Sequence, residues 1–503
     1  MRPARIYLPL RYALVGILLL LTAACGDDMP GETLARSRHM PAWYEDAKLG
    51  IFIHWGPASV PAFAAGGPLA PGELEEMLLG DSPREELPYS EWYLYSMSRP
   101  DSATREYHAN VYGEAPYFDF GPVFEERVNA SWDPAAWAEL FHAAGARYVV
   151  LVTKHHDGYP LWPSQVDNPH QPSWGAERDM VGDLARAVRA KDMRFGVYYS
   201  TGLDWTFQME AEGDLVRDML LSAPGDEIYG DYVYEHLEEL IAGYSPDVLW
   251  ADIGYPSSGR LPEILEHYFE SVPDGVVNDR WGAVDELSGF AALPGGAAIM
   301  KALARWLTNN ADPLADDPAR IGFKTAEYAS LAGIAPFKWE ATRGLGASFA
   351  YNTQDKLENM LDANELVRFV VDTVAKNGNV LINVGPDSFG TIHPEQQAPL
   401  RGLGEWLAVN GAAVYGTRPH IRERNLAGRE LRYTRSGDAL YAIVFGAAQT
   451  TLEIEDPGAA WGEAAVLGAQ VLATEKVDGA VRLTLDQAMP GPAVVVRYQA
   501  SAL

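Results

Sequence analysis

Six apolar segments along this chain each end in polar or aromatic side chains, and helix-like stretches lie between them. An apolar run of this length is typical of a strand buried on both faces, as in a parallel sheet. The segments are Gly50–Gly56, Tyr148–Gly158, Phe195–Ser200, Asp247–Gly254, Ile321–Tyr328 and Val380–Pro386. Polar side chains gathered at the ends of successive parallel strands are typical of a TIM-type barrel. The pattern therefore predicts an α/β chain with a (β/α)8-like barrel.

The intervening stretches carry the signals of helices. Pro134–Ala144 is the clearest of them, because Asp133 can cap its first turn, Pro134 suits the first helical position and Gly145 can end it. The strand–helix alternation places the barrel domain at residues 41–416. The other expected helices are Met180–Lys191, Asp231–Ala242, Leu261–Val272 and Glu365–Lys376.

Two stretches depart from the alternation. Residues 282–320 read as a Gly/Ala-rich loop, an amphipathic helix around Ala298–Leu307 and an Asn/Asp/Pro-rich return. A long excursion between barrel strands is usually functional, so we expect this insertion to cover part of the site. The acidic stretch Glu73–Glu86 is expected to form a surface loop or short helix.

The character of the chain changes after about Thr417. Short alternating runs such as ALYAIVFG and TLEIED are separated by Gly, Asp or Pro, which is typical of antiparallel strands. We therefore expect a small antiparallel β-sandwich at residues 417–503, with no cluster of catalytic residue types.

Length and charge narrow the class of protein. The chain has 503 residues, too many for one typical domain, and 48% of them are hydrophobic, which suffices for a large core. Its formal net charge is −30. That charge disfavours nucleic acid and anionic membrane surfaces as partners and favours a neutral substrate.

The N-terminus has the layout of a secretory signal. Three arginines precede an apolar run over Tyr12–Leu21, which is short for a membrane span. Small residues follow, so we expect a signal peptide at residues 1–24 and export to the periplasm or the cell surface.

Cys25 is the only cysteine of the chain, so no disulfide within the chain is possible. Its place after Leu21-Thr22-Ala23-Ala24 resembles a bacterial lipobox, in which the cysteine carries a lipid. We expect a lipoprotein with a flexible tether at residues 25–40, which touches the membrane only through this anchor. The alternative is a cysteine that happens to follow an ordinary cleavage site.

Two successive apolar segments end in a carboxylate. Asp252 ends Val248-Leu249-Trp250-Ala251-Asp252, and Glu327 ends a later run. A carboxylate at the mouth of an apolar strand must be paired or functional. Structural pairing with Arg280 or Lys324 would account for them equally well. A pair of carboxylates from different barrel strands, in a site rich in aromatic and histidine side chains, points to glycoside hydrolysis.

The histidines raise the question of a metal. His155 and His156 are adjacent, and neighbouring strand residues point to opposite faces, so both would meet one ion only beyond the strand's end. With no third ligand nearby, binding of sugar hydroxyls is the better functional interpretation. One core histidine and one exposed histidine is the alternative. His54 could likewise be a core histidine, and Glu91-Trp92-Tyr93 could be a surface cluster.

Ten motifs together resemble the α-L-fucosidases of glycoside hydrolase family 29, over nearly all of residues 41–418. They are GIFIHWGPASVPAF, EWY, YVVLVTKHHDGYPLW, RDMVGDL, RFGVYYSTGLDW, PDVLWADIGYP, VNDRWG, FKTAEY, KWEATRGLGASFAYN and GNVLINVGPDSFGTI. The resemblance implies a barrel with a C-terminal β-sandwich, a retaining reaction on fucosylated glycans, and neither a cofactor nor a metal. Ile253 and Tyr255 stand where the family varies, and both are expected at the pocket rim.

The resemblance also implies roles for particular residues. Asp252 matches the family nucleophile, and Glu327 matches the acid/base of members with a similar K-T-A-E-Y motif. An apolar wall at Phe349 and Trp250 would select the methyl group of fucose. The implied fucose-binding residues are His54, Tyr89, Glu91, Trp92, His155, His156, Tyr198, Trp250, Arg280 and Phe349.

Three functions agree with this sequence. A retaining exo-α-L-fucosidase predicts release of fucose and loss of turnover when Asp252 is replaced. A non-catalytic surface glycan-binding protein predicts binding alone, but it would need neither Asp252 nor Glu327. A related retaining glycosidase would act on another L-sugar, such as an α-L-galactoside.

Overall fold

The computed structural model describes residues 30–67, 87–310, 312, 314–317, 320–420, 430–447, 450–458 and 460–500. The expected signal peptide, Cys25 and the whole acidic stretch Glu73–Glu86 lie outside these residues. Within the described chain, no single helix is long and apolar enough to cross a membrane. Only the helix pair Asp285–Ala291 and Gly296–Leu307, bent by 119°, meets those criteria jointly.

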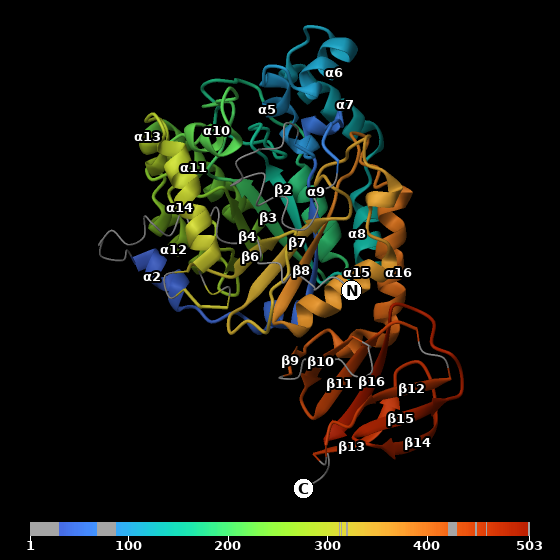
Figure 1. Cartoon of the computed structure of the whole chain (residues 1–503). Coiled ribbons are helices and arrows are strands. Elements are labelled where there is room, and N and C mark those ends of the chain that lie inside the picture. Colours follow the sequence, from blue (N-terminus) through green and yellow to red (C-terminus); the bar gives the residue numbers. More distant parts are fainter. Residues whose placement is uncertain are drawn as a thin grey trace.

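Parallel strands form the predicted barrel in the first part of the chain (Figure 1). In the described residues they make an 8-stranded sheet in the order β5-β4-β3-β2-β1-β8-β7-β6. A parallel bridge between Asn278 and Phe323 joins the β5 and β6 sides and closes the ring. The strands are β1 (Leu49–Ile53), β2 (Tyr148–Lys154), β3 (Arg194–Ser200), β4 (Val248–Asp252), β5 (Val276–Val277), β6 (Lys324–Glu327), β7 (Trp339–Gly344) and β8 (Gly378–Val384).

The strands β5 and β7 have no counterpart among the six apolar segments. Strand β5 has only 2 residues, too few for a periodic signal. Strand β7 reads WEATRG, and Glu340, Thr342 and Arg343 interrupt any apolar run. The other strands confirm the positions predicted from the sequence.

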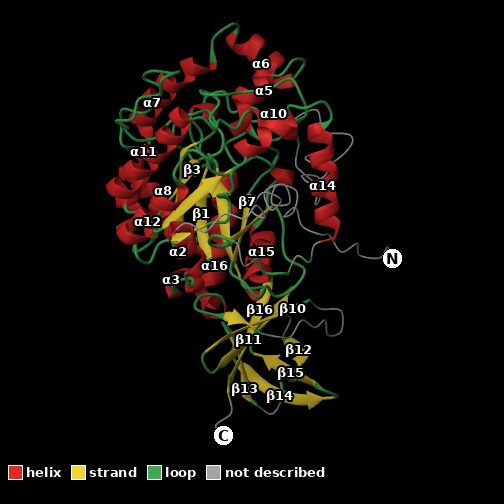
Figure 2. Ribbon diagram, turned by 90° about the vertical axis from the view of Figure 1, so that its left-hand side faces the viewer, coloured by secondary structure: helices red, strands yellow, loops and turns green. Residues whose placement is uncertain are grey.

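Helices surround the strands on the outside of the barrel (Figure 2). Helix α8 begins as predicted, because the Asp133 side chain accepts hydrogen bonds from the backbone N–H groups of Ala135 and Ala136. The helices of the barrel domain are α3 (Ala42–Ala47), α5 (Tyr93–Ser98), α6 (Ala103–Tyr112), α7 (Phe120–Ser131), α8 (Pro134–Ala143), α9 (Met180–Arg189), α10 (Leu215–Leu221), α11 (Glu227–Tyr244), α12 (Leu261–Ser271), α13 (Ser288–Ala291), α14 (Gly296–Asn310), α15 (Ala363–Ala375) and α16 (Pro394–Asn410).

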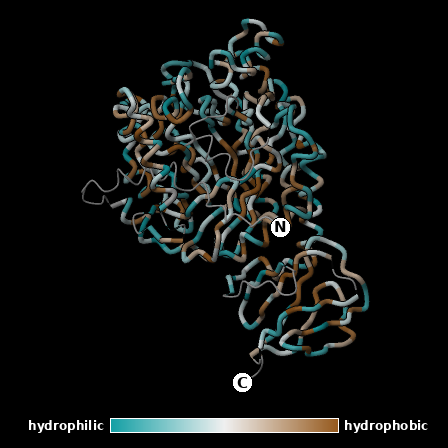
Figure 3. The backbone as a smooth tube through the Cα atoms, viewed as in Figure 1, coloured by the Kyte–Doolittle hydropathy of each residue, from teal (hydrophilic) through white to brown (hydrophobic). Residues whose placement is uncertain are grey.

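The barrel strands are hydrophobic, as the brown tube along them indicates (Figure 3). The interior they enclose holds a cluster rich in aromatic rings. A buried carboxylate, Glu340, lies among them. It accepts hydrogen bonds from the hydroxyls of Tyr44 and Tyr148 at 2.8 and 2.5 Å and from the indole of Trp250 at 3.1 Å. These donors satisfy a charge whose burial would otherwise be costly.

The expectation of a flexible tether up to residue 40 is wrong for residues 30–37. They form helix α2 (Pro30–Ser37), which packs against α12. The contact is close, because a β-carbon on Gly31 would lie 1.7 Å from the carbonyl oxygen of Pro262. Ala35 is buried, and Glu32 pairs with Arg36. Packing against α12 therefore stabilises a helix that a polar segment with Gly and Pro would not form alone.

The C-terminal residues form two antiparallel sheets below the barrel, as expected for a β-sandwich (Figure 1). One sheet has the order β13-β16-β11-β10-β9 and the other β12-β15-β14. The strands are β9 (Arg418–Pro419), β10 (Leu431–Ser436), β11 (Ala439–Phe445), β12 (Thr451–Glu455), β13 (Trp461–Val466), β14 (Val471–Val477), β15 (Ala480–Leu485) and β16 (Ala493–Ala500).

Candidate active site

A cavity of about 740 Å³, open mouth included, lies at the C-terminal ends of the barrel strands. Every residue that the sequence suggested for catalysis or sugar binding lines it. Consecutive strands deliver them: His54 follows β1, His155 and His156 follow β2, Tyr198 lies in β3, and Trp250 and Asp252 end β4. The barrel thus brings together side chains that lie far apart in the chain, from Phe52 to Phe349.

Arg280 joins the two carboxylates of the cavity. Its guanidinium donates to Oδ1 of Asp252 at 2.6 Å and to Oε2 of Glu327 at 3.1 Å. The Tyr198 hydroxyl donates to Oδ2 of Asp252 at 2.7 Å, and the Ile253 backbone N–H also contacts this carboxylate. Glu327 pairs with Arg280, so the alternative of an ion pair with Lys324 does not describe the site.

The electrostatic surroundings of Glu327 favour its protonated form. Burial raises the pKa of this carboxyl, and the negative charge of Asp252 raises it further, while Arg280 acts in the opposite direction. The two carboxylates raise the pKa of Arg280 despite its burial, so the guanidinium remains charged. Two neighbouring carboxyl groups with different environments are the arrangement that separates an acid from a nucleophile.

The three histidines of the cavity are held in their neutral forms. Burial lowers the pKa of His54 to about 4 and lowers the pKa values of His155 and His156 well below the usual value. Nδ1 of His54 lies 2.7 Å from Oδ1 of Asn383, and Nδ1 of His156 lies 2.6 Å from Oγ of Ser200. Strand β2 ends at Lys154, which is why the adjacent His155 and His156 can both face the cavity. Neutral imidazoles suit hydrogen bonds with uncharged hydroxyls.

Glu91 comes from the long segment between β1 and β2, in the short helix η3 (Ser90–Trp92). Its Oε2 accepts from the Ser348 hydroxyl and from the backbone N–H of Ala350, both at 3.0 Å. Burial raises the pKa of Glu91 to about 7, although these donors act to lower it. Trp92 packs edge-on against His156, so Glu91 and Trp92 belong to the cavity wall rather than to a surface cluster.

Aromatic rings close the cavity. Tyr198 and Trp250 stack with their ring centroids 5.5 Å apart, and Arg280 lies 4.8 Å from the centre of the Trp250 ring. Phe349 stacks on His54 at 4.8 Å. The Tyr89 hydroxyl and Nδ1 of His155 are buried without a hydrogen-bond partner. Buried polar atoms of this kind suit a ligand that carries hydroxyl groups.

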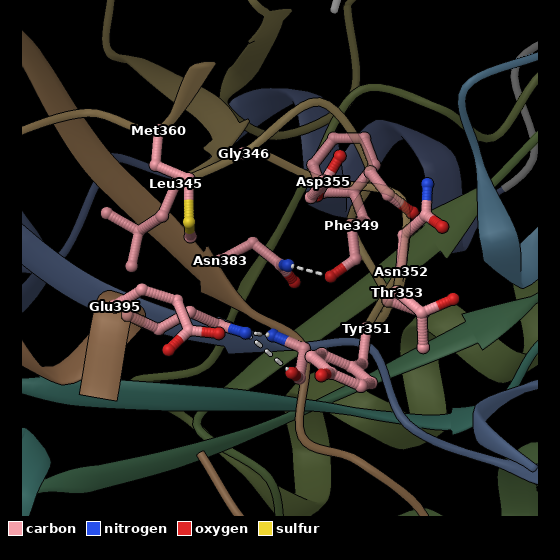
Figure 4. A pocket seen from close by; sticks show the side chains of 14 residues that line it. Leu345, Gly346, Phe349, Tyr351, Asn352, Thr353, Asp355, Met360, Asn383 and Glu395 are labelled. Atoms are coloured by element: carbon pink, nitrogen blue, oxygen red, sulfur yellow. Dashed lines mark hydrogen bonds between the residues drawn. The ribbon is translucent and has the colours of Figure 1, made fainter. Parts of the chain in front are cut away.

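Asn383 is a functional residue that the sequence reasoning missed. Its Oδ1 contacts His54, and its amide donates to the Phe349 carbonyl at 2.5 Å (Figure 4). One side chain therefore positions both the β1 histidine and the loop after β7. An amide inside the apolar run VLINVGP was the signal that could have found it, since a polar residue in a buried strand needs partners.

The loop after β7 separates the site from a neighbouring cavity of about 610 Å³ (Figure 4). Phe349 and Ser348 form part of the shared wall. On the far side, the Gln396 side chain bonds both the N–H and the carbonyl of Gly385. These contacts hold the turn after β8, which packs closely against the loop that carries Phe349, because a β-carbon on Gly385 would lie 2.4 Å from the backbone nitrogen of Tyr351.

Several aliphatic lining residues also escaped the sequence reasoning. Leu215 and Met219 lie on α10, and Leu87 comes from the segment before η3. Ile253 lies at the rim as expected, whereas Tyr255 is buried away from the cavity and donates to the Gly259 carbonyl. No motif of reactive residues marks α10, so only the fold could place it here.

The expectation that residues 282–320 cover the site is wrong for the described part of that insertion, none of which lines the cavity. Helices α13 and α14 instead pack beside α10. Within the described chain, no group of three or more His, Cys, Asp or Glu side chains could hold a metal ion.

A parallel barrel with paired carboxylates in an aromatic pocket at its C-terminal end defines a glycoside hydrolase. The family model described as Alpha-L-fucosidase matches residues 28–412. The human tissue α-L-fucosidase is 30% identical over 421 residues, which cover 81% of this chain and 76% of that protein. The α-L-fucosidase of Dictyostelium discoideum is 30% identical over 425 residues, covering 81% and 78%.

Solved structures agree in fold. The Thermotoga maritima α-fucosidase in complex with fucose is 34% identical, with a TM-score of 0.73 over 92% of this chain and 98% of that one. Its complex with a mechanism-based inhibitor gives a TM-score of 0.75 over 94% of this chain and 100% of that one. This chain belongs to the α-L-fucosidase family and is a glycoside hydrolase.

Proposed function

We propose that the protein is a retaining exo-α-L-fucosidase that removes terminal α-L-fucose from glycans through a fucosyl-aspartate intermediate. The observation that carries this proposal is the arrangement of Asp252 and Glu327 about one guanidinium in an aromatic-lined pocket. Retaining glycosidases use one carboxylate as nucleophile and one carboxyl group as acid and then base.

In the first step, an Oδ atom of Asp252 attacks the anomeric carbon while Glu327 donates its proton to the departing glycosidic oxygen. The bond to the leaving group breaks as the bond to Asp252 forms. Arg280 and Tyr198 hold the Asp252 carboxylate for this attack.

In the second step, Glu327 takes a proton from a water molecule that attacks the same anomeric carbon and releases fucose. Esterification of Asp252 removes the negative charge that raises the pKa of Glu327. The acid of the first step is thereby prepared to act as the base of the second.

The remaining lining residues would bind the sugar. His54, His155 and His156, as neutral imidazoles, can bond hydroxyls, as can Glu91. Phe349 and Trp250 offer an apolar wall to the methyl group at C5 of fucose. Because an apolar wall rejects an added hydroxyl only by a factor on the order of 10², an α-L-galactoside would be a slow substrate.

The decisive experiment is azide rescue of two variants with an aryl α-L-fucoside, using the protein without residues 1–25. Asp252→Gly with azide should give β-fucosyl azide, because azide replaces the nucleophile on its own face. Glu327→Ala with azide should give α-fucosyl azide. In that variant azide takes the place of water in the second step, attacks the anomeric carbon from the face opposite Asp252 and breaks the ester bond to Asp252. Products of the opposite configuration would contradict the assigned roles.

The same assay separates the other functions. Faster turnover of the α-L-galactoside than of the α-L-fucoside would assign the site to that sugar. A folded parent protein that binds fucose without releasing it from any fucoside would be a glycan-binding protein instead.

We also propose that the protein is exported and anchored through a lipid on Cys25. The apolar run and small residues before Cys25 support this. Expression of the full chain and its Cys25→Ser variant in a bacterial host, followed by membrane fractionation and mass spectrometry of the N-terminal peptide, tests it. A wild-type chain without lipid would refute the anchor.

A further inference from the structure

Helix α14 of the insertion carries apolar residues on two opposite faces. Met300 and Ala304 are buried in the core that the barrel helices share. Ile299 and Trp306 lie on the other face, where each is 59% exposed, and the exposed Ala302 lies between them. A surface helix normally presents charged and polar residues to water on this side. Ile299, Ala302 and Trp306 are called the apolar face below.

The segment that leads into α14 adds to this exposed apolar surface. Phe290 of α13 is 42% exposed, and Leu293 in the turn before α14 is 56% exposed. Figure 2 shows α14 at the edge of the molecule. Large apolar side chains exposed in one region mark a surface that contacts a protein or a membrane.

The composition of α14 favours a membrane as the partner. Its charged residues are Lys301 and Arg305, both basic, in a chain with 69 acidic and 39 basic residues. Apolar side chains, a tryptophan and basic residues are typical of helices that lie in the surface of a bilayer. With α13 the helix is apolar enough for a membrane segment. The bend of 119° and the buried Met300 and Ala304 exclude a straight span and leave contact with the membrane surface.

The start of the folded chain limits the distance between this side of the barrel and a lipid on Cys25. Helix α2 begins at Pro30 and packs against α12, so residues 25–29 alone lie between the lipid and the fold. Five extended residues reach at most about 18 Å. Figure 1 shows α2, α12 and α14 on the same side of the barrel. A lipid on Cys25 would therefore hold this side of the barrel close to the membrane.

We propose that the apolar face of α14 is a membrane contact surface, which lies in the headgroup region of the bilayer that holds the lipid on Cys25. This surface rests on the lipid anchor of the proposed function and extends the membrane contact beyond that anchor. Each methylene group that leaves water favours the bound state by roughly fourfold. Contact at two points would also restrict how the barrel turns on its anchor.

The single cysteine of the chain allows a direct test. In the full chain purified from bacterial membranes, the lipid blocks the thiol of Cys25, so the variant Ile299→Cys takes a thiol-reactive fluorophore at one position. The vesicles are phosphatidylcholine with a nitroxide near the glycerol end of the acyl chain. The label should lose about half or more of its emission, because an interfacial helix lies roughly 5–10 Å into this boundary. Leu472→Cys on β14, a position 60% exposed, is the matched control and should lose almost none.

A second change tests whether apolar burial holds the helix in the membrane. Trp306→Glu, added to the labelled Ile299→Cys protein, should reduce the quenching by about twofold or more, because a carboxylate resists transfer from water. Leu472→Glu in the same background should leave the quenching unchanged. Hydrolysis of an aryl α-L-fucoside by each labelled protein shows that it is folded.

Equal quenching at positions 299 and 472, with the lipid on Cys25 confirmed by mass spectrometry, would overturn the membrane contact and leave the anchor standing. A wild-type chain without lipid would overturn the anchor and this contact with it, while fucose release would still support the proposed activity. Light scattering of the Cys25→Ser protein tests a second copy as the partner. A mass of two chains, with the label at position 299 shielded before vesicles are added, would assign the face to that copy and overturn the membrane contact.

Discussion

Arg280 is the residue on which the chemistry of the pocket converges. It contacts both carboxylates and lies over the Trp250 ring. Its positive charge lies against the Asp252 carboxylate and limits how far burial can raise the pKa of Glu327. Without Arg280, burial and the charge of Asp252 would raise the pKa of Glu327 further.

The first prediction concerns Glu327 as the acid. Its raised pKa means that the carboxyl keeps its proton to higher pH than usual, so activity is lost as pH rises through that pKa. Glu327→Ala should abolish this alkaline limb in the kcat/KM profile. It should slow alkyl fucosides by about 10²–10⁴, but aryl fucosides with good leaving groups much less. An unchanged alkaline limb in the variant would assign the proton to another group.

The second prediction uses Glu91. Its pKa of about 7 in the folded protein lies above that of an unfolded glutamate, so the folded state binds more protons between these values. Stability contributed at this site therefore falls as pH rises from about 4.5 to 7. Glu91→Gln should remove that decline. Between pH 5 and pH 8 the free energy of unfolding of the wild type should therefore fall by up to about 3 kcal/mol more than that of the variant.

Urea unfolding at both pH values measures this difference, and Glu358→Gln at an exposed position is the control. An equal wild-type and Glu91→Gln pH dependence would show that Glu91 is not responsible.

At the scale of elements, β7 links the barrel core to the site. Its Glu340 accepts from Tyr44 at the barrel bottom and from Trp250 beneath Arg280. This polar network crosses the interior of an otherwise apolar barrel and fixes the indole on which the guanidinium rests.

The third prediction is that Glu340→Leu strongly destabilises the protein. It leaves the hydroxyls of Tyr44 and Tyr148 and the Trp250 indole without an acceptor, and each such loss costs about 1–3 kcal/mol. Glu340→Gln keeps an acceptor and should lose considerably less. Thermal unfolding of both variants measures this, and equal losses would contradict a hydrogen-bonding role.

At the scale of the whole molecule, the two domains share a core. Tyr441, Ile443 and Phe445 of the sandwich belong to the same buried apolar cluster as the barrel helices. Arg432 of β10 also bonds Asp372 of α15 at 2.7 Å. The two domains are therefore expected to unfold as one unit.

The fourth prediction tests this coupling through Arg432. Burial acts to raise the pKa of Asp372, but Lys376 and Arg432 outweigh it and hold the pKa below its usual value. Arg432→Ala should cost roughly 1.5–3 kcal/mol at pH 7. This cost should shrink as pH falls below the ordinary pKa of an aspartate, since the carboxylate is then lost.

Calorimetry of the wild type should give one transition, and kcat/KM of the variant should match the wild type because no described sandwich residue lines the cavity. Two separate wild-type transitions would refute the coupling.

The sequence by itself was enough for the features that depend on local pattern. Long apolar runs marked most barrel strands, caps marked helices such as α8, and the polar ends of the strands pointed to the residues of the cavity. These signals can be recognised in the sequence because a strand buried on both faces consists of apolar residues until the chain reaches the loop, where polar side chains become possible.

Tertiary contacts alone decided the rest. Strand β7 is polar and is a strand because its neighbours accept its hydrogen bonds, and α2 is a helix because α12 covers it. Asn383 gained its role only when β8 was placed beside β1. Leu215 and Met219 resemble any helix-core residues in the sequence, and only the packing of α10 between α5 and α14 brings them to the wall of the cavity.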